Sequence, residues 1–70
     1  MEYGVNVVFK DGNYWSKAYT YVAKTPYERG DIVIVQKGTF YSVGKVSSCQ
    51  EDLKRDPMIK YSNVIMKVTL

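Results

Sequence analysis

The chain has 70 residues, which is enough for one small domain in which a limited hydrophobic core must stabilise the fold. Ten Lys and Arg residues against seven Asp and Glu residues leave a net charge of +3, so the chain is only mildly basic. A content of 46% hydrophobic residues excludes a disordered chain. The chain has no histidine and a single cysteine, so it lacks the commonest acid–base group and cannot form an internal disulfide.

The N-terminal segment and the longest apolar run bear on the location of the protein. Met1–Val5 contains no basic region followed by an apolar stretch, and Ile32–Val35 is far too short to cross a bilayer. We therefore expect neither a signal peptide nor a membrane partner. The lone cysteine favours a reducing compartment, and together these features predict a soluble cytoplasmic protein.

The first half of the chain predicts a β-hairpin followed by a loop. Tyr3–Phe9 alternates apolar residues with small or polar ones, which is the pattern of a half-buried strand. The turn sequence Asp11-Gly12-Asn13 leads into a second strand over Ser16–Ala23, with Tyr14 and Trp15 near the tip. The residues from 25 to 30, with a proline near their start and a glycine at their end, predict a loop.

Two further strands are predicted in the middle of the chain. Asp31–Gln36 is apolar on both faces, as expected for a strand inside a sheet or barrel. Lys37-Gly38 predicts a tight turn into a fourth strand over Thr39–Val46. Within that strand, Gly44 predicts a β-bulge that turns both Val43 and Val46 inward.

The last third predicts a short helix and a final strand. Ser48-Cys49-Gln50-Glu51 matches a capping box, which predicts a helix from about Cys49 to Lys54 with Leu53 over one opening of the barrel. The final strand is predicted over Ser62–Leu70. Its apolar face would carry Val64, Met66, Val68 and Leu70.

These elements predict an all-β fold, a five-stranded SH3-like barrel with one short helical turn before the last strand. An OB-like barrel is the alternative, but Lys37-Gly38 leaves no room for the helix that an OB barrel usually has between its third and fourth strands. The whole chain, from 1 to 70, is expected to form this single domain.

Three segments of the chain, Tyr19-Thr20-Tyr21, Gly30-Asp31-Ile32-Val33-Ile34-Val35 and Val43-Gly44-Lys45-Val46, carry a resemblance to a known family. They are similar to the N-terminal DNA-binding domain of the primosomal helicase PriA and to small phage-encoded barrel proteins. The resemblance runs from Tyr19 to Val46 and implies a barrel, in the host cytoplasm if the chain is phage-encoded. The PriA domain recognises the 3′ end of a DNA strand. Here Gln36-Lys37-Gly38 replaces the Pro-Phe-Gly turn of that family, so no ligand-binding residue is carried over.

Aromatic and basic residues that lie near one another are the candidate contact residues. They are Tyr14, Trp15, Lys37, Tyr41 and Lys45. Single-stranded nucleic acid is bound by this combination, because rings stack on bases and lysines neutralise phosphates. The alternative interpretation is structural: Trp15 would cap the core and the lysines would form an ordinary solvated surface. Tyr41 is expected to be exposed, because its side chain points away from that of Phe40.

The sequence contains no glycine-rich phosphate loop, nucleophile elbow or paired catalytic acids, so we expect neither an enzyme nor a cofactor or metal. The preferred function is a protein-interaction module, which includes a small phage-type modulator of a host protein. The alternative is a module that binds single-stranded nucleic acid. Interspersed acidic residues and an isoelectric point of about 9.0 favour the protein partner narrowly. A third hypothesis is a homodimer through the terminal strand, where Ile65 faces away from its neighbours.

Overall fold

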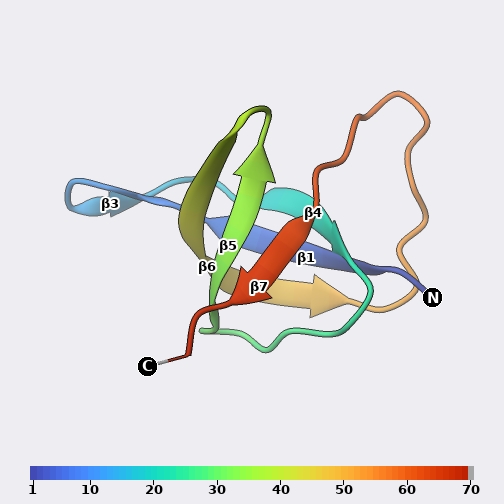
Figure 1. Cartoon of the computed structure of the whole chain (residues 1–70), viewed down its shortest axis with the longest axis horizontal. Coiled ribbons are helices and arrows are strands. Elements are labelled where there is room, and N and C mark those ends of the chain that lie inside the picture. The colour runs from blue at the N-terminus through green and yellow to red at the C-terminus, as the bar shows by residue number, and fades with distance from the viewer. Residues whose placement is uncertain (70) are drawn as a thin grey trace.

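The computed structural model describes residues 1–69, which form strands, turns and loops without a helix (Figure 1). The strands are β1 (Tyr3–Val8), β2 (Lys10–Asp11), β3 (Tyr14–Trp15), β4 (Tyr19–Ala23), β5 (Ile32–Lys37), β6 (Phe40–Gln50) and β7 (Val64–Lys67). Five of them form one antiparallel sheet in the order β4-β1-β6-β5-β7, and β2 pairs with β3 in a separate two-stranded extension. The predicted all-β, five-stranded fold is confirmed.

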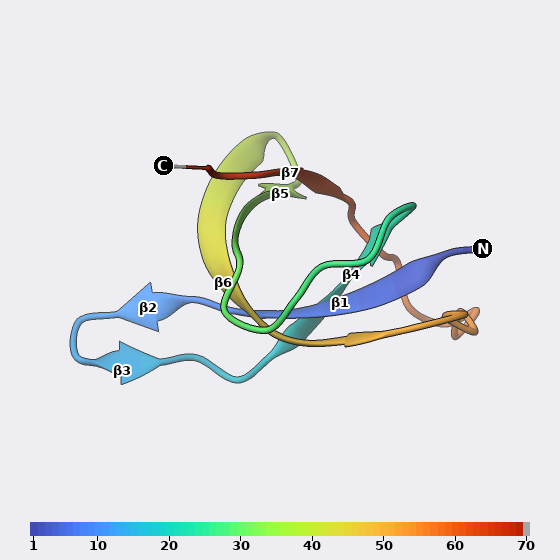
Figure 2. The same cartoon turned by 90° about the horizontal axis from the view of Figure 1, so that it is seen from below.

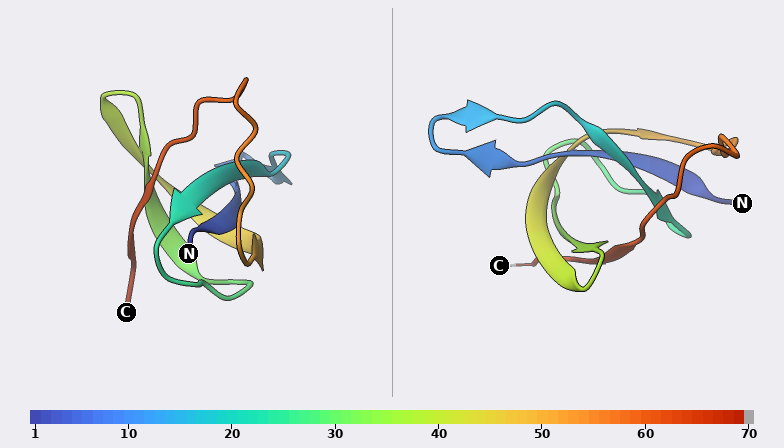
Figure 3. Two further views of the ribbon diagram at one scale, coloured as in Figure 1. Left: turned by 90° about the vertical axis from the view of Figure 1, so that its right-hand side faces the viewer. Right: turned by 90° about the horizontal axis from the view of Figure 1, so that it is seen from above.

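The sheet curls into a half-barrel because the long strand β6 bends between two partners (Figure 2). Its first half pairs with β5, and its second half pairs with β1. The two edges of the sheet meet at one place, where the Val22 amide of β4 donates a hydrogen bond of 2.9 Å to the Ser62 carbonyl. The segment between β6 and β7 passes β4 to reach this contact (Figure 3). The half-barrel is thus closed over only a short distance.

A single core fills the concave side of the sheet. Its buried members are Val5, Val7, Tyr21, Ala23, Val33, Val35 and Val46. They alternate with outward-facing residues along β1, β5 and β6, whereas on β4 the intervening Val22 is buried as well. β-Branched valine suits this position because its stiff side chain packs well on a pleated surface. Burying one such side chain contributes about 1.5–3 kcal/mol, so a few valines dominate the stability of a chain this short. Residues 1–69 include no helix long and apolar enough to cross a membrane.

Gly44 does not form the predicted bulge. It pairs in regular register with Val33, and Val43 points outward rather than into the core. The register shift in β6 lies further along, where Asn6 pairs with Ser48 but the next residue of β1 pairs with Val46. Gly44 is needed for another reason: it is buried so close to β1 that no side chain fits there.

The predicted helix over Cys49–Lys54 is absent. Cys49 pairs with Val5 of β1, so β6 continues to Gln50. After two bent residues, of which Asp52 has a φ of 53° in the left-handed region, the chain runs on without regular structure. The capping-box prediction is wrong because pairing with β1 satisfies the backbone groups that a helix would have used.

The final strand is shorter than predicted and does not keep its alternation. Val64 pairs with Val35 and packs against the core, whereas Met66 pairs with Ile34, and a register shift separates the two pairs. Since that shift reverses the alternation, Met66 lies on the outer face, and the prediction of one shared apolar face is wrong. Leu70, which was also predicted on that face, lies outside the described residues.

Candidate functional site

The five predicted contact residues lie on different faces of the sheet. Lys37 follows the buried Val35 by two residues, so it shares the concave side of β5 at the open end of the half-barrel. Lys45 and Tyr41 alternate with buried Gly44 and Val46 and therefore lie on the outer, convex side of β6. The structure thus separates Lys37 from these two residues.

The remaining two predicted residues lie on the β2–β3 extension. Trp15 is 46% exposed, and the ammonium groups of Lys10 and Lys45 lie 5.9 and 4.2 Å from the ring centroid. Trp15 therefore packs against lysines on the surface and does not cap the core. Tyr14 pairs with Asp11 and is 79% exposed, and Tyr41 is exposed as predicted.

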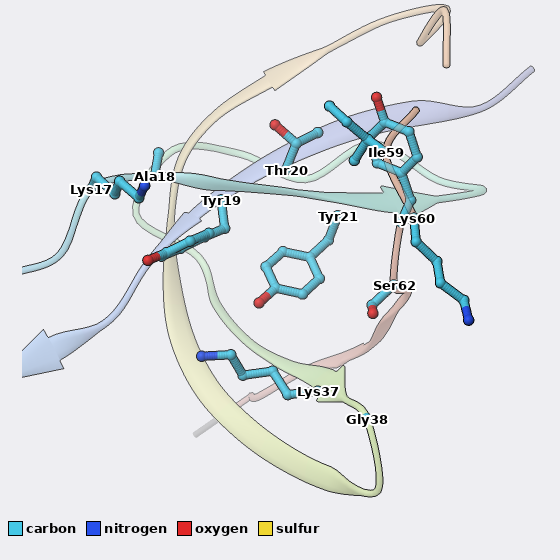
Figure 4. Close-up of a pocket in the computed structure, with 11 residues that line it drawn as sticks. Lys17, Ala18, Tyr19, Thr20, Tyr21, Lys37, Gly38, Ile59, Lys60 and Ser62 are labelled. Carbon is cyan, nitrogen blue, oxygen red and sulfur yellow. The ribbon is translucent and has the colours of Figure 1, made fainter. Parts of the chain in front are cut away.

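A hollow of about 590 Å³ opens at the concave side of the sheet, between β4, the β5–β6 turn and the β6–β7 loop (Figure 4). Its charged and aromatic lining residues are Lys17, Tyr19, Tyr21, Lys37, Lys60 and Tyr61. We call this site the basic hollow, because none of the described residues that line it is an Asp or a Glu.

Three aromatic rings lie in contact at the β4 side of the basic hollow. The Phe9 ring lies 6.2 Å from the rings of both Tyr19 and Tyr21, at interplanar angles of 50° and 74°. Such tilted arrangements suit the aromatic quadrupole. Tyr21 is buried, and burial, followed by the effect of neighbouring Tyr19, raises the pKa of its phenol. Tyr19 is 43% exposed and is the ring that a ligand could reach.

Two lysine side chains lie over these rings. The Lys37 ammonium is 4.6 Å from the Phe9 centroid and 5.7 Å from the Tyr19 centroid, and the Lys17 ammonium is 5.4 Å from Tyr19. Neither ammonium has a carboxylate partner within residues 1–69. A cation–π contact at an exposed site contributes only about 0.5–1 kcal/mol, so both positive charges remain available to an anion.

Sequence reasoning identified only Lys37 among the residues of this site. The signal for Lys17 and Tyr19 is their alternation with Tyr21, which puts all three on the same side of the chain. Lys60 comes from the β6–β7 loop, and no local pattern indicates that this loop returns to β4.

The β6–β7 loop forms one wall of the hollow and is attached to the N-terminus. The Leu53 amide donates a hydrogen bond of 2.8 Å to the Glu2 carbonyl. The Arg55 guanidinium donates two bonds, of 2.9 and 2.7 Å, to the Glu2 carboxylate. Beyond that ion pair, the Asp56 amide donates to the Tyr61 hydroxyl at 3.1 Å. These contacts hold a segment without regular structure in one place.

We expect low pH to weaken the contacts between the β6–β7 loop and Glu2. The hydrogen bonds from Arg55 lower the pKa of Glu2 below its ordinary value of 4.5. The ion pair therefore stabilises the fold above that value, and its contribution is lost as the pH falls through the lower folded-state pKa. The Leu53 amide should lose hydrogen-exchange protection between about pH 6 and about pH 3, as NMR would measure. In Glu2→Gln this amide should be weakly protected at both pH values, and equal pH dependence in the variant would contradict the explanation.

Other chemistry has little support among the described residues. No group of three or more His, Cys, Asp or Glu side chains in residues 1–69 could hold a metal ion. Cys49 is a half-buried free thiol that packs against the core.

No family model, curated protein or solved structure matches this chain. The resemblance to the PriA domain therefore stays a prediction.

Proposed function

We propose that the chain is a non-catalytic module that binds single-stranded nucleic acid in the basic hollow. One observation carries the proposal: the ammonium groups of Lys17 and Lys37 lie 5.4 and 5.7 Å from the centroid of the exposed Tyr19 ring, and neither has a carboxylate partner among residues 1–69. An unpaired base would stack on this ring, and the phosphates on either side of it would approach the two lysines.

The shape of the hollow supports a single strand rather than a duplex. Its volume of about 590 Å³ is that of a small-ligand pocket and suits an unstacked nucleotide. Bases in a duplex are already stacked and paired, so they would have to leave the helix before they could reach Tyr19. Lys60 on the opposite wall adds a third positive charge beside the path of the strand.

A protein-interaction module, which the sequence favoured narrowly, is the second candidate. Its support is the outer side of the sheet, where Val43 is 61% and Met66 is 52% exposed. Exposed apolar residues that cluster on one face are typical of protein contact surfaces. We place nucleic acid first because the hollow combines an accessible ring, unpaired positive charge and a concave shape.

The test is a titration of fluorescently labelled oligonucleotides, single-stranded and duplex, followed by anisotropy. We expect micromolar binding of the single strand and clearly weaker binding of the duplex. If about three phosphates are neutralised, raising the salt from about 50 to about 200 mM should weaken single-strand binding roughly tenfold to twentyfold. An unchanged anisotropy at the highest protein concentration, or equal affinity for the duplex, would refute the proposal.

A further inference from the structure

A second aromatic ring with uncompensated positive charge lies on the β2–β3 extension, on the outer side of the sheet. Trp15 is 46% exposed, and the ammonium groups of Lys45 and Lys10 lie 4.2 and 5.9 Å from its ring centroid. Neither ammonium has a carboxylate partner in the part of the chain that the structure describes, residues 1–69. We call these three side chains the tryptophan patch. Like the basic hollow, the patch presents an accessible ring together with two positive charges.

Two acidic residues lie near the tryptophan patch, and neither offsets its charge. Asp11 is the only acidic residue of the β2–β3 extension, and it alternates with Lys10, so its side chain points to the opposite side of the extension. Asp31 lies next to β6, but its carboxylate is paired with the Lys67 ammonium at 3.2 Å. The side of the extension that carries Trp15 is therefore positive, which favours an anionic ligand.

A short, continuous piece of chain joins the tryptophan patch to the basic hollow. β3 leads directly into β4 (Figure 2), so the Cα atoms of Trp15 and Tyr19 lie at most about 14 Å apart. β4 is an edge strand of the sheet, so no further strand separates the two sites along this path. Lys17 lies between the two rings in the sequence and lines the basic hollow. Positive charge thus continues from one ring to the other over the edge of the sheet.

We propose that the single strand bound in the basic hollow continues over this edge, beside Lys17, and stacks a second base on Trp15. The phosphates next to that base approach Lys10 and Lys45, whose weak cation–π contacts leave both ammonium groups available. The second contact rests on the proposed function, because the same strand occupies the basic hollow. It adds to that function a second stacking position and a path for the strand.

The separation of the two rings sets the length of strand that the chain binds. At the stacked rise of about 3.4 Å per nucleotide, a distance of about 14 Å corresponds to about four nucleotide steps. A strand of about six nucleotides would therefore contact both rings, which lies within the site sizes of about 4–16 nucleotides found for small single-strand-binding barrels. A single strand can turn over the edge of the sheet, whereas a duplex, with a persistence length of about 50 nm, cannot.

The fluorescence of Trp15 tests the second contact, because this residue is the only tryptophan of the chain. The full chain is titrated with unlabelled thymidine dinucleotide and thymidine octanucleotide. The octanucleotide should quench the emission of Trp15, with the same midpoint as its binding curve measured by anisotropy of a labelled copy. The dinucleotide is too short to contact both rings, so it should bind at least tenfold more weakly than the octanucleotide.

Two substitutions in the tryptophan patch should weaken binding of the octanucleotide in different ways. Trp15→Ala should lower the affinity roughly five- to 150-fold, the loss expected for one stacked base. In Lys45→Gln, the slope of log affinity against log salt should become shallower by about 0.7, as for one lost phosphate contact. Tyr14→Ala and Lys24→Gln are the matched controls, because Tyr14 points to the opposite side of the extension and Lys24 follows the other end of β4. Both controls should bind the octanucleotide with unchanged affinity.

The outcomes separate the second contact from the proposed function. Octanucleotide binding that leaves the emission of Trp15 unchanged would overturn the second contact, and so would equal affinities for the dinucleotide and the octanucleotide. If Tyr19→Ala weakened binding in that case, the proposed function would stand without the second contact. An octanucleotide that does not bind at all would refute both. Circular dichroism would establish that each variant is folded, and the emission of the unchanged chain decides the question if Trp15→Ala is not.

Discussion

Gly44→Ala should lower the free energy of unfolding by about 3 kcal/mol, the upper end of the usual range for overpacking a core. An added Cβ would overlap the Val7 side chain, and it would lie 2.9 Å from the Phe9 ring and 3.0 Å from the Val8 carbonyl. Val7 is fully buried and the carbonyl belongs to the backbone of β1, so neither can move aside cheaply. A domain of this size has only about 3–5 kcal/mol of stability, so about 0–2 kcal/mol should remain and between a few per cent and about half of the variant should be unfolded at room temperature. Urea unfolding followed by circular dichroism measures the effect.

Gly4→Ala is the matched control, because Gly4 is also a buried strand glycine without a positive φ. The atoms that an added Cβ would meet, at 2.9 Å, belong to the side chains of Gln50 and Leu53. These side chains are not fully buried and can rotate, so we expect a loss below about 1 kcal/mol. Equal losses in the free energy of unfolding of the two variants would contradict the explanation that the half-barrel requires close packing at Gly44.

Tyr19→Ala should weaken single-strand binding by roughly five- to 150-fold, because stacking of one base on an aromatic ring contributes about 1–3 kcal/mol. Tyr19 is the accessible ring of the basic hollow, whereas Tyr21 is buried and supports the core. In Lys37→Gln, the slope of log affinity against log salt should become shallower by about 0.7, the value expected for one lost phosphate contact with a single strand. The same anisotropy titration at several salt concentrations measures both quantities.

Tyr14→Ala is the control for the stacking experiment, because Tyr14 is an even more exposed tyrosine but lies on the β2–β3 extension. Tyr14→Ala should bind the single-stranded oligonucleotide with the same affinity as the unchanged chain. If Tyr14→Ala lost as much affinity as Tyr19→Ala, the strand would bind along the extension and not in the basic hollow. If neither variant lost affinity, stacking on tyrosine would not be how this chain holds nucleic acid.

Much of the secondary structure follows from local pattern. The alternation in Tyr3–Phe9 predicted β1 and placed Val5 and Val7 in the core, as observed. The apolar run after Asp31 predicted β5, but burial on both faces is wrong: Val33 and Val35 are buried, whereas Ile32 on the outer face is exposed. A strand needs only this period of two to define its buried face, and that period can be read from a few neighbouring residues.

The wrong secondary-structure predictions share one physical cause, which is pairing with a strand distant in the sequence. Ser48-Cys49-Gln50-Glu51 has a local preference for a helix start, but Cys49 lies opposite Val5 of β1 and is held extended. The reversal between Val64 and Met66 likewise depends on the register with β5. Propensity is a weak preference that a sheet partner far along the chain overrides.

The sequence by itself determined that this chain forms a small all-β domain, because alternation, turn residues and valine content are local properties. Only the tertiary structure decided which side chains meet. It brought Lys17 and Tyr19 of one hairpin arm, Lys37 beside a later turn and Lys60 of the last loop around one hollow. It also left Val43 and Met66 together on the opposite side of the sheet. The reason is that strand order and register follow from the packing of the whole core, which residues close in sequence do not specify.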